Sequence, residues 1–204
     1  MGSSVNGGRA HHVTSLLRVS LWAPVCLGAC VRQHQPASSS GPPDSTIAIQ
    51  SFAAGLSTVH AASPDIQLRV RRDPAVAEGP VLDVEYPAGA ADPAARDVWC
   101  DVESRDWSDG SVIRFGIKPD RAIAISLSFL DGNRVAYTAR VPLQADVWQT
   151  VRIPLDSIEP NPYFQPPGAD LDAPLDVRDV ARIGFAPQDS AAGRFSISGI
   201  FLVE

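Results

Sequence analysis

Apolar and polar residues alternate in short runs from about residue 46 to residue 204. These runs show a two-residue period or are continuously apolar, and clusters of Gly, Pro, Asp and Asn separate them. The runs cover 46–52, 66–71, 80–86, 97–103, 111–118, 122–130, 134–141, 148–155, 181–186 and 194–204. No stretch of this region sustains a helical period. About ten strands in about 160 residues predict an all-β fold, and they suit a two-sheet antiparallel sandwich better than a small barrel.

The two-residue period also assigns side chains to faces. In the run 97–103 the aliphatic residues and Cys100 share the face that a core would cover, so that Trp99, Asp101 and Glu103 point outward. An outward tryptophan beside two carboxylates could stack on a sugar ring and accept hydrogen bonds from its hydroxyls. The alternative is that a loop covers Trp99 and makes it part of a second small core.

The neighbouring runs extend this outward row. The same alternation turns Arg114 outward from the run 111–118 and Arg140 outward from the run 134–141, while small residues take the outward positions of 122–130. The two arginines could bind a uronate or sugar hydroxyls, or they could form cross-strand ion pairs with nearby acids. If the strands are neighbours, one sheet face exposes five side chains around a flat floor: Trp99, Asp101, Glu103, Arg114 and Arg140.

Two connecting segments carry their own signals. Leu130-Asp-Gly-Asn-Arg134 predicts a tight hairpin between adjacent antiparallel strands, because Asp-Gly readily supplies the positive φ values that such turns require. The proline-rich segment 159–168 contains Tyr163 and Phe164 side by side, and two neighbouring rings cannot easily both point inward. We therefore expect one of them to be exposed. The rings of this loop either contact a ligand or pack within the loop itself.

Residues 1–29 have the pattern of a secretory signal peptide. Basic and histidine residues without any acid precede the mostly apolar run 19–29. This run is shorter than the roughly 20 residues that span a bilayer, but it falls within the roughly 7 to 15 residues of a signal-peptide apolar segment. Its end, Leu27-Gly-Ala-Cys30, resembles the bacterial lipobox, which implies that Cys30 is lipidated after cleavage. The alternative is a conventional signal peptide cleaved nearby.

The segment 30–45 is polar and rich in Pro and Ser, and we expect a flexible linker ahead of a domain at 46–204. Acyl chains on Cys30 would anchor the exported protein to a membrane, in the periplasm or at the cell surface. Because Cys26 leaves with the signal peptide, Cys100 then has no disulfide partner, and a cysteine-based metal site lacks ligands.

Charge and histidine content exclude several functions. The chain has a net charge of −6, and from residue 31 onward 15 Lys and Arg stand against 23 Asp and Glu, so a basic footprint for nucleic acid is absent. After residue 34 the only histidine is His60, which excludes a His-centred triad or a multi-His zinc site within the domain. Asp101 and Glu103 leave open a glycosidase or lyase, which would need a deep cleft and a carboxyl group of raised pKa.

Four segments, in this order along the chain, resemble the galactose-binding-like β-jelly-roll domains. They are Asp106-Trp-Ser108, Trp148 to Leu155, Val180 to Pro187 and Phe195 to Leu202. That superfamily includes many carbohydrate-binding modules and the complex I intermediate-associated protein 30 family. The resemblance covers roughly residues 46–204. It implies a jelly-roll sandwich, non-catalytic binding on a concave sheet face or at edge loops, and packing roles for Trp107 and Trp148.

The resemblance also bears on calcium. Similar modules often carry carboxylates for a structural calcium ion near the first and last strands, but here the corresponding segments are Ser51-Phe52-Ala53 and Ser198-Gly199. A hard cation needs several oxygen ligands, usually including carboxylates, so we do not expect calcium at that position. A further acidic group precedes residue 180 without the spacing of an EF-hand loop, and it favours a solvated loop: Asp170, Asp172, Asp176 and Asp179.

Together these observations predict a membrane-anchored bacterial lipoprotein whose jelly-roll domain binds a poly- or oligosaccharide without catalysis, with no catalytic residue and no cofactor. The second hypothesis is an assembly domain like the intermediate-associated family, whose partner is another envelope protein. An exposed contiguous apolar patch would favour that role. The candidate ligand-binding residues are Trp99, Asp101, Glu103, Arg114, Arg140, Tyr163 and Phe164.

Overall fold

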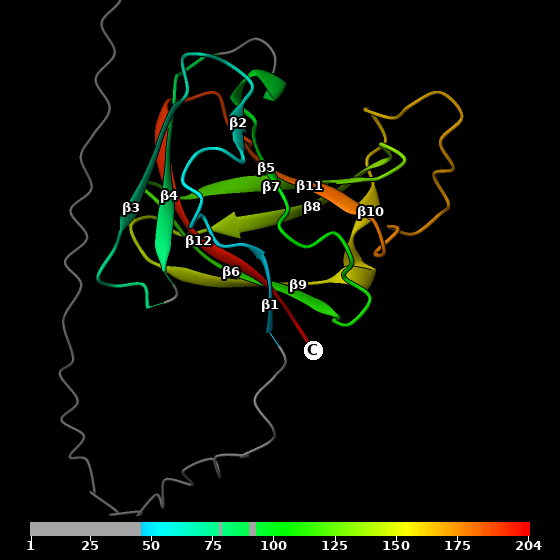
Figure 1. Ribbon diagram of the computed structural model, residues 1–204. Coiled ribbons are helices and arrows are strands. Elements are labelled where there is room, and N and C mark those ends of the chain that lie inside the picture. Colours follow the sequence, from blue (N-terminus) through cyan, green and yellow to red (C-terminus); the bar gives the residue numbers. More distant parts are fainter. Residues whose placement is uncertain (1–45, 78, 90–92) are drawn as a thin grey trace, which may run out of the picture. The chain divides into compact units, whose positions relative to one another are not determined.

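The computed structural model describes residues 46–77, 79–89 and 93–204 (Figure 1). The predicted signal peptide, Cys30 and the predicted linker 30–45 lie outside the described residues. The described part forms β-strands with two short 3-10 turns between them, Pro93–Arg96 and Leu155–Ser157. The strands are β1 (Thr46–Gln50), β2 (Val59–Ala61), β3 (Gln67–Arg72), β4 (Pro80–Tyr86), β5 (Val98–Asp101), β6 (Val112–Pro119), β7 (Ile123–Asp131), β8 (Ala136–Leu143), β9 (Gln149–Pro154), β10 (Glu159–Pro160), β11 (Val180–Pro187) and β12 (Gly193–Val203).

Two antiparallel sheets pack face to face (Figure 1). The first sheet has the order β3-β4-β12-β6-β9, and β1 also pairs with β12. The second sheet has the order β10-β8-β7-β11-β5-β2. This arrangement confirms the predicted all-β, two-sheet jelly-roll sandwich. Among the residues described, no helix is long and apolar enough to cross a membrane.

The core lies between the sheets and follows the predicted period. Alternate residues of β6 and β7 are buried from one end of each strand to the other. Phe115 of the first sheet and Phe185 of the second meet edge to face, with ring centroids 5.7 Å apart, so the two layers interlock in an arrangement that aromatic pairs favour. Trp107 is fully buried and donates from Nε1 to the Ser104 carbonyl at 2.7 Å, which confirms its packing role.

Cys100 also belongs to this core. Its side chain is fully buried, and burial raises the pKa of the thiol to about 12. A thiol that stays protonated at neutral pH is a small apolar packing residue, as the period of β5 predicted.

The predicted hairpin joins β7 to β8, but a different residue takes the left-handed conformation. Arg134 has φ 66°, whereas Gly132 is not among the residues of positive φ. Position 132 requires glycine for a steric reason, because a Cβ there would collide with the Asp179 carboxylate. The Asp131 side chain accepts a hydrogen bond from the Val135 amide at 2.8 Å and closes the turn.

Two strands of the second sheet escaped the sequence prediction. β2 pairs with β5 over three residues, and β10 pairs with β8 over two. Segments this short cannot display a period of two, so their pairing is decided by neighbouring strands rather than by their own pattern.

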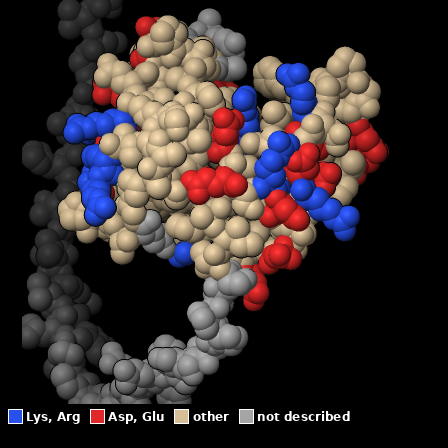
Figure 2. Space-filling view, in the orientation of Figure 1, with Lys and Arg blue, Asp and Glu red and all other residues tan. Residues whose placement is uncertain are grey.

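Charge is spread unevenly over the surface. Figure 2 shows Lys and Arg side chains gathered over the edge strand β3, whose sequence contains Arg69, Arg71 and Arg72. On the other side of the same view, acidic and basic side chains lie interspersed.

Candidate functional site

The outer face of the second sheet is hollowed into a cleft of about 710 Å³. Strands β5, β7, β8 and β11 form its floor, and the loop after β10 forms one wall. Neighbouring strands lie about 4.8 Å apart, so four strands give a floor about 14 Å wide. Its lining includes polar, charged and aromatic side chains: Asp97, Trp99, Ser126, Ser128, Arg134, Thr138, Arg140, Tyr163, Phe164 and Arg182.

Strand register places these floor residues in rows across the sheet. The middle row runs from Thr138 through Ser128 and Gly184 to Trp99. Gly184 has a specific function in this row, because a Cβ there would lie 2.9 Å from atoms of the Trp99 indole. The half-buried indole therefore rests across Gly184, on the floor of the cleft, as a platform beside the polar groups.

Hydroxyl groups cover the floor beyond the indole. Thr138 donates its hydroxyl proton to the Leu127 carbonyl at 3.0 Å, and its Oγ1 lies 3.0 Å from Ser126 Oγ. Since Thr138 has only one hydroxyl proton, Ser126 must be the donor in their contact. The lone pairs of Ser126 Oγ remain available to accept a hydrogen bond from a ligand.

The wall is a loop that presents two aromatic rings to solvent. Tyr163 is 84% exposed and Phe164 is 65% exposed, so both rings point outward where the sequence predicted one. Gln165 fastens this loop to β8: its side-chain amide donates to the Ala136 carbonyl at 2.6 Å and accepts from the Ala136 amide at 3.0 Å. The side chain thereby continues the ladder between β10 and β8.

Three arginines and one aspartate are the charged residues of the cleft: Arg134, Arg140, Arg182 and Asp97. Arg182 donates from Nε to Oδ1 of Asp101 at 2.8 Å, and His60 Nε2 lies 2.8 Å from the other oxygen, Oδ2. Burial opposes ionisation of Asp101, but the hydrogen bonds from His60 and Arg182 outweigh it and lower the pKa of this carboxyl group.

Four of the seven candidate residues therefore meet in one place, Trp99, Arg140, Tyr163 and Phe164. Asp101 borders the cleft, and its two carboxylate oxygens accept hydrogen bonds from Arg182 and His60. That these residues bind a ligand stays a prediction.

The expectation that Arg114 and Glu103 share this face is wrong. Arg114 lies on β6 of the first sheet, with its guanidinium 5.5 Å from the centroid of the Phe201 ring. Glu103 follows the end of β5 and accepts hydrogen bonds from the Ser51 amide at 2.9 Å and the Ser51 hydroxyl at 2.6 Å. The two-residue period tells which way a side chain points from its strand, but it does not tell which sheet the strand joins.

The packing role expected for Trp148 is also wrong. Trp148 precedes β9, is only half buried, and lines a shallow cavity on the outer face of the first sheet beside Gly116 and Ser198. The family-like motif around it places its strand correctly, yet the indole lies outside the core between the sheets.

Sequence reasoning missed four residues of the site. The alternation of 134–141 turns Arg134 outward without marking it as a ligand contact, and nothing in the pattern singles out Arg182, Gly184 or Gln165. Arg182 could have been found from its period in β11, since it alternates with the buried Ile183. The roles of Gly184 and Gln165 depend on Trp99 and Ala136, which are distant in the sequence and carry no local signal.

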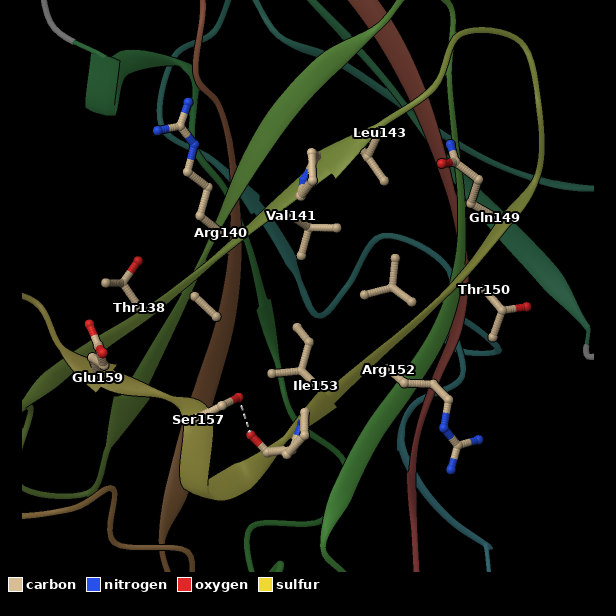
Figure 3. A pocket seen from close by; sticks show the side chains of 14 residues that line it. Thr138, Arg140, Val141, Leu143, Gln149, Thr150, Arg152, Ile153, Ser157 and Glu159 are labelled. Atoms are coloured by element: carbon tan, nitrogen blue, oxygen red, sulfur yellow. Dashed lines mark hydrogen bonds between the residues drawn. The ribbon is translucent and has the colours of Figure 1, made fainter.

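A second cavity, of about 560 Å³, opens between β8 and β9 at the edge of the sandwich (Figure 3). The side chains of Val141 and Ile153 lie between the strands, while Arg140 and Arg152 point away from one another. Ser157 donates to the Pro154 carbonyl at 2.7 Å and closes one end. Among the described residues no aromatic side chain lines this cavity, so it has no platform for a sugar ring.

The carboxylates do not form the acid and base pair that catalysis would need. The pKa of Asp101 is lowered, whereas a general acid at neutral pH requires a raised pKa, and Glu103 lies outside the cleft. In the described part of the chain, no three His, Cys, Asp or Glu side chains group together as a metal site would require. Asp179, from the acidic loop, binds Arg105 at 2.6 Å. The expectation of no calcium stays a prediction.

The two-sheet fold is a β-sandwich of the galactose-binding-like type. Residues 64–204 match the family model described as carbohydrate binding domain (family 11). The chain belongs to this family.

Relatives with known names agree with this assignment. The chain is 28% identical over 108 residues to Endoglucanase H of Acetivibrio thermocellus, an alignment that covers 48% of this chain and 12% of that enzyme. The family 11 module of a cellulosomal cellulase of Clostridium thermocellum has 20% identity and a TM-score of 0.60, over 78% of this chain and 94% of the module. A structure of a Clostridium thermocellum family 11 module in complex with a β-1,3-1,4-mixed-linked tetrasaccharide gives 20% identity and a TM-score of 0.60, over 76% and 94%.

Proposed function

We propose that the cleft of the second sheet binds one stretch of a polysaccharide chain without catalysing a reaction on it. The Trp99 indole lying across Gly184 carries this proposal, because a flat apolar surface level with the sheet floor fits the C–H face of a sugar ring. The hydroxyls and guanidinium groups around it supply hydrogen bonds to sugar oxygens.

The cleft dimensions suit an oligosaccharide. A floor about 14 Å wide exceeds one sugar ring, and the two exposed rings at the wall offer a second apolar contact opposite Trp99. The tetrasaccharide bound by the Clostridium thermocellum module supports a linear ligand of this length in this family.

Large exposed apolar side chains give no support to the assembly-domain alternative. Among the residues described they are Leu56, Val147, Tyr163, Phe164 and Leu171. Only Tyr163 and Phe164 are neighbours in the sequence, and both line the cleft, where they are part of the proposed glycan site.

A second part of the proposal concerns location. The apolar run 19–29 followed by Leu27-Gly-Ala-Cys30 supports export and lipidation of Cys30, and residues 30–45 would hold the module away from the membrane. Expression in a bacterial host with a radiolabelled fatty acid tests this directly. We expect label and membrane association in the native chain and neither in Cys30→Ser; a labelled Cys30→Ser protein would refute the assignment.

Binding is tested with the full chain carrying Cys30→Ser, which removes the proposed lipidation, on an array of plant, microbial and host polysaccharides. We expect saturable binding to at least one of them, confirmed by calorimetry, and no release of reducing ends on prolonged incubation. Trp99→Ala should abolish binding while thermal unfolding stays cooperative. Absence of binding to every polysaccharide would refute the proposed function.

A further inference from the structure

We propose that the glycan for this cleft is acidic, a chain whose sugars carry carboxylate or sulfate groups. The inference rests on the proposed function and goes further by assigning the chemical class of the ligand. It comes from the charges that line the cleft, which differ in sign from the rest of the chain.

The cleft is positive within an acidic protein. Three arginines line it against one aspartate, with Arg182 paired to Asp101 at its border, whereas the whole chain has a net charge of −6. The arginines come from separate places: Arg134 from the β7–β8 turn, Arg140 from β8 and Arg182 from β11. Three elements thus direct guanidinium groups to one concave surface, where their fields add and attract anions.

Two of these arginines have no carboxylate partner among the described residues. Salt bridges occupy Arg71, Arg96, Arg105, Arg121 and Arg182, but not Arg134 or Arg140. The register places Asp97 and Arg140 at opposite ends of one row across the sheet, β8 to β5, with their backbones about 14 Å apart.

Arg182 is fixed in place by its partner. Its Nε donates to Asp101, which leaves its Nη groups as donors, and Asp101 is held from the other side by His60. This bridge has a second effect. Asp101 lies two residues from the Trp99 platform along the chain, as Asp97 does, and each of its oxygens already accepts one hydrogen bond, which leaves it fewer lone pairs for sugar hydroxyls.

Arg134 and Arg140 therefore bring positive charge and guanidinium donors to the cleft, and neither is in a salt bridge within the described residues. A neutral sugar offers hydroxyls that both donate and accept, and it would cover Arg134 and Arg140 without supplying a countercharge, at a cost in desolvation. A carboxylate or sulfate group supplies that charge and accepts paired hydrogen bonds from a guanidinium. Arg134 and Arg140 lie six positions apart, up to about 20 Å along β8, so the two arginines would contact different sugars of one chain.

The experiment compares acidic polysaccharides with neutral forms of the same backbone. Polygalacturonate and alginate are tested beside their carboxyl-reduced forms, carrageenan beside its desulfated form, and mixed-linked β-glucan serves as a neutral reference. Calorimetry on the full chain carrying Cys30→Ser should show at least about tenfold tighter binding to one acidic form than to its neutral form. The ratio of the two affinities should fall in 0.5 M salt, which is about three times the physiological ionic strength.

Variants locate the effect in the cleft. Arg140→Gln and Arg134→Gln should each weaken binding of the acidic glycan about tenfold and change binding of its neutral form less than about twofold. Arg69→Gln, an exposed arginine of β3 on the other sheet, removes the same charge and should have no such effect.

Each outcome separates this inference from the proposed function. Carboxylated ligands alone, or sulfated ligands alone, identify the anion and support the inference. If neutral forms bind as tightly as acidic ones, the acidic-glycan inference is overturned and glycan binding itself stands. The inference is also overturned if Arg69→Gln removes the acidic preference while Arg134→Gln and Arg140→Gln leave it unchanged. Binding to no polysaccharide refutes the proposed function itself.

Discussion

Arg71 of the first sheet and the cleft arginines of the second sheet differ in how their charges are satisfied. On the first sheet, Arg71 donates to Asp83 at 2.5 Å and to Asp73 at 3.0 Å, and Ser196 donates to the other oxygen of Asp83. On the second sheet, Arg134 and Arg140 face the cleft without such a partner in the described part of the chain. The pair of Arg71 and Asp83 links β3 to β4, whereas Arg134 and Arg140 are the groups that we propose for the ligand.

The same contrast applies to the tryptophans. Each outer face carries one indole beside a glycine, Trp148 near Gly116 and Trp99 over Gly184. Trp148 shares a cavity of about 250 Å³ with residues 75–77, while Trp99 lies in one of about 710 Å³. A tryptophan on a strand face therefore does not define a binding site by itself, and the open floor around Trp99 makes the difference.

The largest change in glycan affinity should come from replacing Trp99 with alanine. Trp99→Ala removes the platform and should weaken glycan binding at least about 30-fold, equivalent to about 2 kcal/mol, as for an aromatic hot spot. Trp148→Ala is the matched control and should leave affinity within about twofold. Calorimetry measures both, and circular dichroism checks that both fold. Equal losses in the two variants would contradict the contrast between the faces.

The second largest change in glycan affinity should come from replacing Gly184 with alanine. Gly184→Ala places a Cβ 2.9 Å from the Trp99 ring, so the indole must lift from the floor, and affinity should fall about tenfold. Overpacking should also cost about 1 to 3 kcal/mol of stability. Gly116→Ala meets Ser198 Oγ at the same 2.9 Å on the opposite face and controls for crowding. The idea fails if Gly184→Ala binds like the native protein.

A smaller effect is expected from the wall. Gln165→Ala removes both hydrogen bonds to Ala136 and frees the loop that carries Tyr163 and Phe164, so affinity should fall about three- to tenfold through the cost of ordering that loop. Amide hydrogen exchange should show faster exchange at Ala136, whose N–H loses its acceptor. Unchanged protection of this amide would show that Gln165 does not hold the loop.

The smallest effect concerns pH. Because the pKa of Asp101 in the folded protein is lowered from 3.8, its bonds to Arg182 and His60 stabilise the fold above about pH 4, and this contribution is lost as pH falls through the folded value. The Asp101 side chain is 40% exposed, so Asp101→Asn should lower the free energy of unfolding by no more than about 1 kcal/mol at pH 7. Denaturant titrations should show the two proteins converging as pH falls below the folded pKa of Asp101. A gap that persists there would exclude ionisation as its cause.

Much of the fold followed from alternation alone. Ten predicted runs correspond to strands, and the alternation within β6 and β7 agrees with the predicted outward positions of Arg114 and of the small residues of 122–130, because a strand buried on one side must alternate. The resemblance to jelly-roll modules added the order of the elements. For the site, the outward direction of Trp99 and Arg140 and the exposure at Tyr163 and Phe164 were within reach of the sequence.

The assembly of the site depended on contacts between distant residues. Arg114 and Arg140 both point outward from their strands, yet β6 and β8 lie in different sheets, and only the tertiary structure separates them. The indole of Trp99 rests on Gly184, and the loop at Tyr163 is fastened to Ala136, across 85 and 29 positions of chain. The sequence by itself determined local direction, since that depends on backbone geometry between neighbours. Which surfaces meet was decided by strand pairing, whose free energy comes from residues far apart in the chain.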